Sequence, residues 1–184
     1  MAIQIEKTFR LEEPIEQVWR LLSDPQRVAA CVPGAKITEQ VNETTYKGAI
    51  SVRVGPSVTD YKGEMQIVRL DADKHEIEIV GKGQDVKGRG SASMKMTGAA
   101  RSLETGDTEV TSVSELNVVG ILAQMGARVI NEVSNVIFAQ FVKNFQAQLQ
   151  QPADTPVSDA KPLSATSMAW AAAKGAFHRK SQDQ

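Results

Sequence analysis

Residues 110–152 read VTSVSELNVVGILAQMGARVINEVSNVIFAQFVKNFQAQLQQP, and the hydrophobic period changes in the middle of this stretch. Before Gly120, apolar and polar residues alternate, which predicts a β-strand. Over residues 121–150, apolar residues recur every three or four positions without a proline, which predicts one long helix. At the usual rise per residue this helix would be about 45 Å long. We therefore expect a strand that leads directly into a helix long enough to cross a sheet.

The chain before this stretch predicts mainly strands. Residues 2–11 alternate and predict a first strand. Pro14 and the pair Asp24 and Pro25 are typical helix starts, so two short helices should follow. Over residues 36–119, alternating segments are separated by short turns that contain Gly, Asn or Asp, which predicts an antiparallel meander. The whole pattern predicts an α+β fold, in which an antiparallel sheet wraps around a long C-terminal helix.

The length of 184 residues favours one packed domain, which we expect to cover residues 1–151. Residues 152–163 are rich in Pro, Asp, Ser and Thr and predict a flexible linker. Residues 164–184 predict an amphipathic or disordered tail. Aromatic residues make up only 5% of the chain, so the core is expected to consist of Val, Ile, Leu, Met and Ala.

The composition argues against several classes of protein. A formal net charge of -1 provides no overall attraction to nucleic acid, so we expect no nucleic-acid partner. The N-terminus has no apolar signal core, and no apolar run approaches the length needed to span a bilayer. Cys31 is the single cysteine, so no intrachain disulfide can form. These features favour a cytoplasmic protein.

Candidate catalytic residues are few. His75 and His178 are the only histidines, and neither has a nucleophile or a metal-ligand spacing beside it, so we predict neither a catalytic centre nor a metal site. Asp60 or Glu115 could act as a carboxylate in a cavity, although a place on the solvent face of a strand suits them better. Cys31 is expected to be a small buried residue rather than a reactive thiol.

Methionines on the expected inner faces suggest a ligand site. Met65, Met94, Met96 and Met125 fall on inward strand positions or on the helix stripe, and methionine suits a pocket for a flat ring and an alkyl tail. Ordinary core filling is the alternative interpretation. The hydroxyls of two inward serines could bond to each other, to water or to a ligand carbonyl. The residues predicted to bind the ligand are Ile50, Val52, Tyr61, Met65, Ile79, Met94, Met96, Ser112, Ser114, Met125, Val129, Val133, Val136 and Ile137.

The tail carries a pattern typical of a membrane surface. Trp170 and Phe177 are seven residues apart, so they lie on one side of a helix, and basic residues follow them. A helix that docks on a protein partner, or an inert tail, remains an alternative. The residues predicted to contact the membrane are Met168, Trp170, Lys174, Phe177, Arg179 and Lys180.

Four short motifs occur in an order that resembles one known family. Cys31-Val32-Pro33-Gly34-Ala35 resembles the CxPGA turn of the carbon monoxide dehydrogenase CoxG family. Residues 54–63, VGPSVTDYKG, are similar to its Gly-Pro hairpin and the Tyr-x-Gly strand that follows. Residues 81–85 and 88–90, GKGQD and GRG, resemble its glycine-rich hairpin. Residues 119–126, VGILAQMG, resemble the start of its long helix, so the resemblance covers residues 1–150.

This resemblance implies a fold and a function that spacing alone does not. It implies the helix-grip fold of the START–Bet v 1-like (SRPBCC) superfamily, with an internal apolar cavity. It also implies a non-catalytic accessory protein of a molybdenum hydroxylase or CO dehydrogenase-type enzyme, peripheral at the inner face of the cytoplasmic membrane. A respiratory quinone is the hydrophobic ligand that such a protein would carry, and no other cofactor is expected. The alternatives are a structural adaptor without a ligand and a small-molecule enzyme of the same superfamily.

Overall fold

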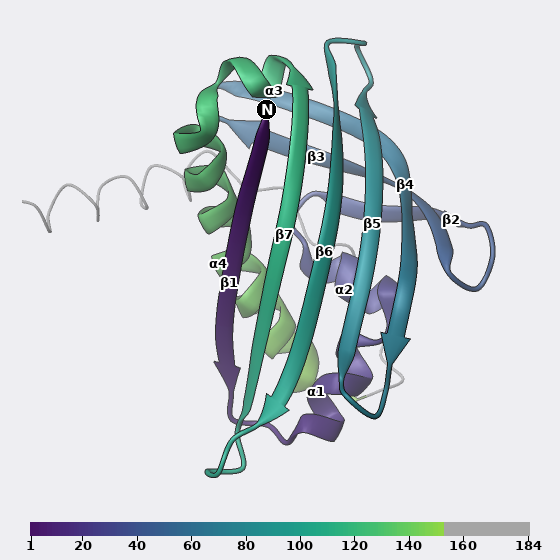
Figure 1. Ribbon diagram of the computed structural model, residues 1–184, viewed down its shortest axis with the longest axis vertical. Coiled ribbons are helices and arrows are strands. Elements are labelled where there is room, and N and C mark those ends of the chain that lie inside the picture. The colour runs from purple at the N-terminus through teal and green to yellow at the C-terminus, as the bar shows by residue number, and fades with distance from the viewer. Residues whose placement is uncertain (153–184) are drawn as a thin grey trace, which may run out of the picture.

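The computed structural model describes residues 1–152, which form a curved antiparallel sheet with helices on its concave side (Figure 1). The strand order in the seven-stranded sheet is β1-β7-β6-β5-β4-β3-β2. The strands are β1 (Ala2–Leu11), β2 (Ala35–Gln40), β3 (Thr45–Val54), β4 (Ser57–Asp71), β5 (Glu76–Asp85), β6 (Gly90–Ser102) and β7 (Thr108–Gly120). The helices are α1 (Ile15–Leu22), α2 (Pro25–Cys31), α3 (Ile121–Gln124) and α4 (Gly126–Leu149).

The meander from β2 to β7 matches the sequence expectation, because each strand pairs with the next along the chain. The first strand joins the last, and the pairing runs from Ala2 opposite Asn117 to Leu11 opposite Thr108. The N-terminal ammonium of Met1 also donates to the carbonyl oxygen of Val118 at 2.8 Å. Because β1 and β7 pair along their whole length, the start of the chain and the start of the C-terminal helices lie close together.

The predicted short helices are present. The carboxylate of Asp24 accepts hydrogen bonds from the backbone N–H groups of Gln26 and Arg27, at 3.1 and 3.2 Å. This side chain therefore satisfies two donors that the first turn of α2 would otherwise leave open. Pro14 was expected in the first turn of α1, but it is the extended residue directly before the helix.

The prediction of one uninterrupted helix over residues 121–150 is wrong, because the helical conformation is interrupted between α3 and α4. Gly126 has a φ of +81°, a left-handed conformation that glycine adopts without steric cost. The apolar period continues across this position, so periodicity alone does not reveal the interruption. The remaining helix α4 has 24 residues, which corresponds to about 36 Å.

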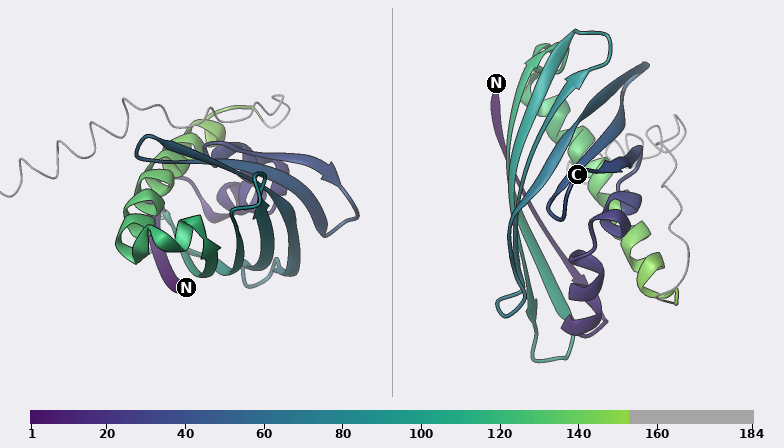
Figure 2. Two further views of the ribbon diagram at one scale, coloured as in Figure 1. Left: turned by 90° about the horizontal axis from the view of Figure 1, so that it is seen from above. Right: turned by 90° about the vertical axis from the view of Figure 1, so that its right-hand side faces the viewer.

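The core is concentrated at one end of the domain, where α1, α2 and the C-terminal half of α4 cover the sheet (Figure 2). Most buried members of the core are aliphatic, as the composition predicted, but an aromatic cluster lies beside them, because Phe9 packs edge-on against three rings of α4. Its ring centroid lies 5.7 Å from Phe138, 6.1 Å from Phe141 and 6.0 Å from Phe145. Four phenylalanines are thus gathered in one place. The buried members of this core are Leu11, Val18, Leu21, Cys31, Ala100, Val110, Phe145 and Leu149.

Truncation of Phe145 tests this core. The side chain has no exposed surface, so Phe145→Ala should lower the free energy of unfolding by about 3–5 kcal/mol. Urea denaturation followed by circular dichroism measures the change. The control Lys143→Ala removes an exposed side chain from the same helix and should change stability by about 0.5 kcal/mol or less. Equal effects of the two substitutions would contradict the placement of the core.

Candidate functional site

Cross-strand pairing decides which side chains share the concave face. Directly opposite residues of neighbouring strands project to the same side of a sheet. Phe9 contacts α4, so its alternate neighbour Ile5 also lies on the helix side. From Ile5 the pairing leads to Ser114, then to Met96, then to Ile79. The predicted inward register of these strands is therefore correct.

The same pairing places the remaining predicted strand residues on that face. Met94 lies opposite Gly81, and Gly81 lies opposite Met65. Tyr61 lies opposite Ile50. The face therefore carries Ile50, Val52, Tyr61, Met65, Ile79, Met94, Met96, Ser112 and Ser114.

Helix α4 spans this face rather than lying flat on it. Its backbone approaches the sheet at β1 and at β3, near opposite edges, and comes less close to the strands between them. Seen from above, the curved sheet and α4 surround the concave side (Figure 2). Helix α4 is therefore in contact with the sheet near its two edges, and it covers the middle strands less closely.

Solvent exposure divides the concave face into two parts. Beside the Phe145 core the side chains are buried, whereas toward α3 buried side chains alternate with half-buried apolar ones. The half-buried apolar side chains on this part are Ile5, Ile50, Val52, Met65, Met94, Met96 and Leu116. An apolar surface that stays accessible between two layers is the kind of lining that small-molecule sites use.

Some predicted ligand residues also take part in ordinary packing. Ile79 is buried in a second cluster with Tyr46, Ile67 and Ile77, and Met65 and Met96 pack against that cluster. For these residues core filling is part of their role. Met94 is different, because its methyl group lies over Gly81, 4.0 Å from the place of an added Cβ atom.

The predicted helix residues are more exposed than a packed stripe would be. Val133 is buried, with 8% exposed surface, whereas Val129, Val136 and Ile137 are half-buried. Met125 is half-buried at the break between α3 and α4. Most of the predicted apolar residues on α4 therefore remain partly accessible.

Ser112 and Ser114 lie on the concave face opposite Lys7 and Ile5. Within residues 1–152, neither serine side chain forms a hydrogen bond, so the two hydroxyls do not bond to each other. Lys7 itself donates to Asn135 of α4 and lies over the Phe138 ring, 5.5 Å from its centroid.

A buried carboxylate, that of Asp85, lies at the edge of the concave face near the β5–β6 turn. Asp85 lies opposite Tyr61 and accepts hydrogen bonds from the Arg89 guanidinium at 2.9 and 3.0 Å. The backbone N–H groups of Lys87 and Arg89 also donate to this carboxylate. Asp85 and Arg89 were not predicted from the sequence as site residues, since only strand pairing and the turn bring them to Tyr61. Thr59 was also missed, although its alternation with Tyr61 indicated its face.

The ionisation states of Asp85 and Tyr61 do not suit proton transfer. The hydrogen bond from the Arg89 guanidinium lowers the pKa of Asp85 to about 2. Burial, together with the Asp85 charge, raises the pKa of Tyr61. Near neutral pH the aspartate therefore stays ionised and the phenol stays protonated. General acid–base catalysis needs pKa values close to the working pH. The pKa of Asp85 and the pKa of Tyr61 are both shifted away from neutral pH.

The other candidate catalytic residues are dispersed. His75 packs edge-on against Trp19, with ring centroids 5.2 Å apart. Asp60 accepts a hydrogen bond from Ser51 on the exposed side of the sheet, and Glu115 is exposed on β7. Among residues 1–152, no three His, Cys, Asp or Glu side chains are grouped to hold a metal ion.

Cys31 behaves as a buried small residue. Its side chain has no exposed surface, and Sγ donates to the Arg27 carbonyl oxygen at 3.2 Å. Burial raises the pKa of the Cys31 thiol to about 12. The nucleophilic thiolate is therefore scarce at physiological pH.

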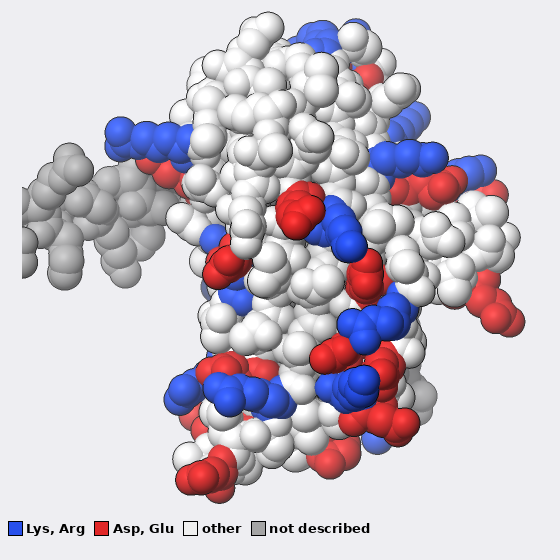
Figure 3. Space-filling view, in the orientation of Figure 1, with Lys and Arg blue, Asp and Glu red and all other residues white. Residues whose placement is uncertain are grey.

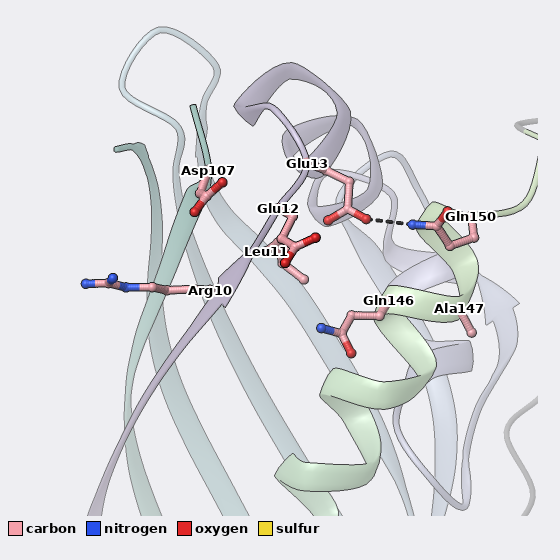
Figure 4. A pocket seen from close by; sticks show the side chains of 8 residues that line it. All are labelled: Arg10, Leu11, Glu12, Glu13, Asp107, Gln146, Ala147 and Gln150. Atoms are coloured by element: carbon pink, nitrogen blue, oxygen red, sulfur yellow. Dashed lines mark hydrogen bonds between the residues drawn. The ribbon is translucent and has the colours of Figure 1, made fainter. Parts of the chain in front are cut away.

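A pocket of roughly 590 Å³ lies at the end of the domain away from the β5–β6 turn. It is formed by the end of β1, the β6–β7 turn and the end of α4 (Figure 4). Six of its eight lining residues are polar or charged, and Gln150 Nε2 donates to Glu13 Oε1 at 2.7 Å. Acidic side chains outnumber the single arginine, so this pocket does not suit an apolar ligand. The lining residues are Arg10, Leu11, Glu12, Glu13, Asp107, Gln146, Ala147 and Gln150.

The predicted membrane-contact residues of the tail lie outside the residues that the structure describes. Within residues 1–152, no helix is both long enough and apolar enough to cross a bilayer. The outer face of the sheet is unevenly charged, and Figure 3 shows charged side chains gathered over its lower half, with the upper half largely uncharged. Val86 and Val119, at the uncharged end, are 55% and 60% exposed.

Comparison with known proteins identifies relatives in sequence and in fold. Residues 8–150 match the family model for CoxG, a subunit of carbon monoxide dehydrogenase. No protein with a curated description matches the chain in sequence.

Solved structures share the fold at low sequence identity. A conserved protein from Geobacillus kaustophilus has a TM-score of 0.72 at 20% identity, over 80% of this chain and 95% of that one. The Zhui aromatase/cyclase from Streptomyces sp. R1128 has a TM-score of 0.60 at 13% identity, over 85% of this chain and 100% of that one. A START superfamily protein from Mycobacterium smegmatis has a TM-score of 0.55 at 10% identity, over 80% and 97%. The helix-grip fold implied by the motifs is thereby confirmed.

The raised pKa of Cys31 predicts a thiol that does not react in the native state. With 5,5′-dithiobis(2-nitrobenzoic acid) at pH 8, the folded protein should release less than about a tenth of one equivalent of chromophore within minutes. The same protein in 6 M guanidinium chloride should release one equivalent rapidly, because unfolding returns the thiol to its ordinary pKa of about 8.5. Fast reaction of the folded protein would show that Cys31 is accessible and activated.

Proposed function

The chain belongs to the carbon monoxide dehydrogenase CoxG family, and from that membership we propose that it is a non-catalytic accessory protein that carries a hydrophobic ligand. Its partner would be a molybdenum-containing CO dehydrogenase-type enzyme. The observation that carries the proposal is the half-buried apolar face between the sheet and α4, rich in methionine. A domain without a ligand would gain stability by closing this face.

A respiratory quinone is the ligand we propose. It combines a flat ring with a long apolar tail, and methionine adapts to both shapes. At about 25 cal/mol per Å² of apolar area buried, a ligand of this size could gain several kcal/mol before the costs of binding. An enzyme outside the bilayer cannot reach a quinone dissolved in it, so a carrier that meets both would connect them.

Peripheral contact with the cytoplasmic membrane completes the proposal. Trp170, Phe177 and the basic residues of the tail would meet an anionic lipid surface. The largely uncharged end of the sheet, with exposed Val86 and Val119 and with Lys87 in the adjoining turn, supports contact at the same end of the domain as the half-buried ligand face. A contact at this end would place the ligand face close to the membrane.

Direct analysis of the bound ligand tests the proposal. Protein purified without detergent from a quinone-producing host is extracted with organic solvent, and the extract is examined by mass spectrometry. We expect a quinone at a substantial fraction of one equivalent. An extract without quinone, from protein that also fails to bind added decylubiquinone, would favour a structural adaptor instead.

Enlargement of Val133 should block ligand uptake. Val133→Phe places a ring between α4 and the sheet, and should reduce decylubiquinone uptake about tenfold with little loss of stability. The matched control Val113→Phe enlarges a half-exposed valine on the outer face of β7 and should leave uptake unchanged. Binding is measured by titration, and stability by thermal unfolding. In a solid core, overpacking would instead cost about 1–3 kcal/mol and leave uptake unchanged.

Removal of the tail should abolish membrane association and preserve ligand binding. A chain that ends at Pro152 lacks the aromatic and basic residues that would meet the lipid head groups, each basic residue contributing up to about 1 kcal/mol. Co-sedimentation with anionic liposomes at low and high salt compares the full and shortened chains. We expect salt-sensitive pelleting of the full chain alone. Equal pelleting of both would assign membrane contact to the end of the sheet and favour a tail that docks on a protein partner.

A further inference from the structure

Two hydroxyl groups on β4 are buried without a partner. Thr59 is 1% exposed and Tyr61 is 5% exposed, and neither Thr59 Oγ1 nor the Tyr61 hydroxyl forms a hydrogen bond within the described structure. Native proteins satisfy the great majority of buried polar side chains. Two unsatisfied hydroxyls on one strand, two residues apart, therefore call for an explanation beyond folding.

These hydroxyls lie on the concave face, directly beside half-buried apolar side chains. Thr59 lies opposite Val52 and Tyr61 lies opposite Ile50, and both of these apolar partners are half-buried. Along β4 the same face continues through Gly63 to Met65. The pair thus stands at one end of the apolar surface proposed to hold the ligand.

Glycines leave the surface beside Tyr61 without side chains. Gly63 lies opposite Gly83, and Gly83 follows the same face as Gly81. A Cβ atom added at Gly83 would lie 3.8 Å from the Tyr61 Cβ. No side chain therefore reaches toward the phenol from these glycine positions, and backbone lies beside it there.

The charges beside the pair are already compensated. Asp85 is paired with Arg89 through two hydrogen bonds, at 2.9 and 3.0 Å, and Arg89 is the cation that acts on Tyr61. The phenol stays protonated because burial and the Asp85 charge raise its pKa. The pair thus offers neutral hydroxyls that can donate or accept. A ligand carboxylate would meet the Asp85 charge without an unpaired arginine to balance it.

We propose that Thr59 and Tyr61 form the polar end of the ligand site and hydrogen-bond an uncharged carbonyl or hydroxyl oxygen of an amphipathic ligand. The apolar body of that ligand lies along the half-buried methionines, so the inference rests on the proposed carrier function. The polar end would make the site selective, since it would bind a ligand with a neutral oxygenated head group more tightly than a fatty acid of equal length. It also explains why the fold retains two buried hydroxyls without protein partners.

Binding of three probes to matched variants tests this selectivity. Decylubiquinone, decylbenzene and decanoate compete with the neutral dye N-phenyl-1-naphthylamine for the full-length protein. Tyr61→Phe and Thr59→Val should each weaken decylubiquinone binding about fivefold, because one hydrogen bond is lost. Neither substitution should change decylbenzene binding. The wild type should bind decanoate at least tenfold more weakly than decylubiquinone.

Tyr46→Phe is the matched control. Tyr46 is also a buried tyrosine on the concave face, but its hydroxyl donates to the Glu43 carbonyl oxygen at 3.2 Å and accepts from Gln40 at 3.3 Å. Its loss should lower the melting temperature and leave probe binding unchanged. Tyr61→Phe and Thr59→Val should keep or raise the melting temperature, because each removes a buried group that has no partner.

The outcomes distinguish failure of the proposed polar end from failure of the proposed carrier function. If decylubiquinone binds the variants as tightly as the wild type, while decylbenzene also binds, the polar end is wrong and the carrier function stands. A melting temperature that falls in Tyr61→Phe as much as in Tyr46→Phe would show that the phenol has a structural partner. If neither decylubiquinone nor decylbenzene displaces the dye from the wild type, the polar end falls together with the carrier function.

Discussion

The packing of the C-terminal half of α4 is the contact on which the rest of the domain depends. Phe145 and Leu149 are buried against β1 and the short helices. Polar bonds reinforce this end, since Asn144 Nδ2 donates to the Cys31 carbonyl oxygen at 2.9 Å and Gln148 Nε2 to that of Arg27 at 3.2 Å. The helix is therefore held firmly at one end, and toward its opposite end its apolar side chains are only half-buried.

This one-sided anchorage separates stability from binding. The buried aromatic core supplies the apolar contacts that hold the layers together, while the face toward α3 keeps half-buried aliphatic and methionine side chains. The break at Gly126 lies at the open end, where α3 continues from β7 before α4 begins. A substitution in the core and one on the open face should therefore affect different properties.

The electrostatics of the concave side favour binding of a neutral molecule over catalysis. The one buried carboxylate that faces the open surface, Asp85 among residues 1–152, is bound by Arg89 and by backbone N–H groups. Tyr61 stays protonated beside it, and the thiol of Cys31 is enclosed in the core. No poised acid, base or nucleophile is thus formed by these groups, and the family membership agrees with an accessory role.

The sequence by itself determined the order of strands and helices, the inward register and the family, because alternation, helical period and turn residues are local signals. Met94 and Met96 could be assigned to the helix side from alternation with Ser93 and Lys95 alone. Only the tertiary structure decided where the helix breaks, since the apolar period runs through Gly126 unchanged. Only strand pairing and burial brought Thr59, Tyr61 and Asp85 together and left two hydroxyls without partners. Whether a polar group finds a partner depends on neighbours distant in the chain, so no local pattern can reveal it.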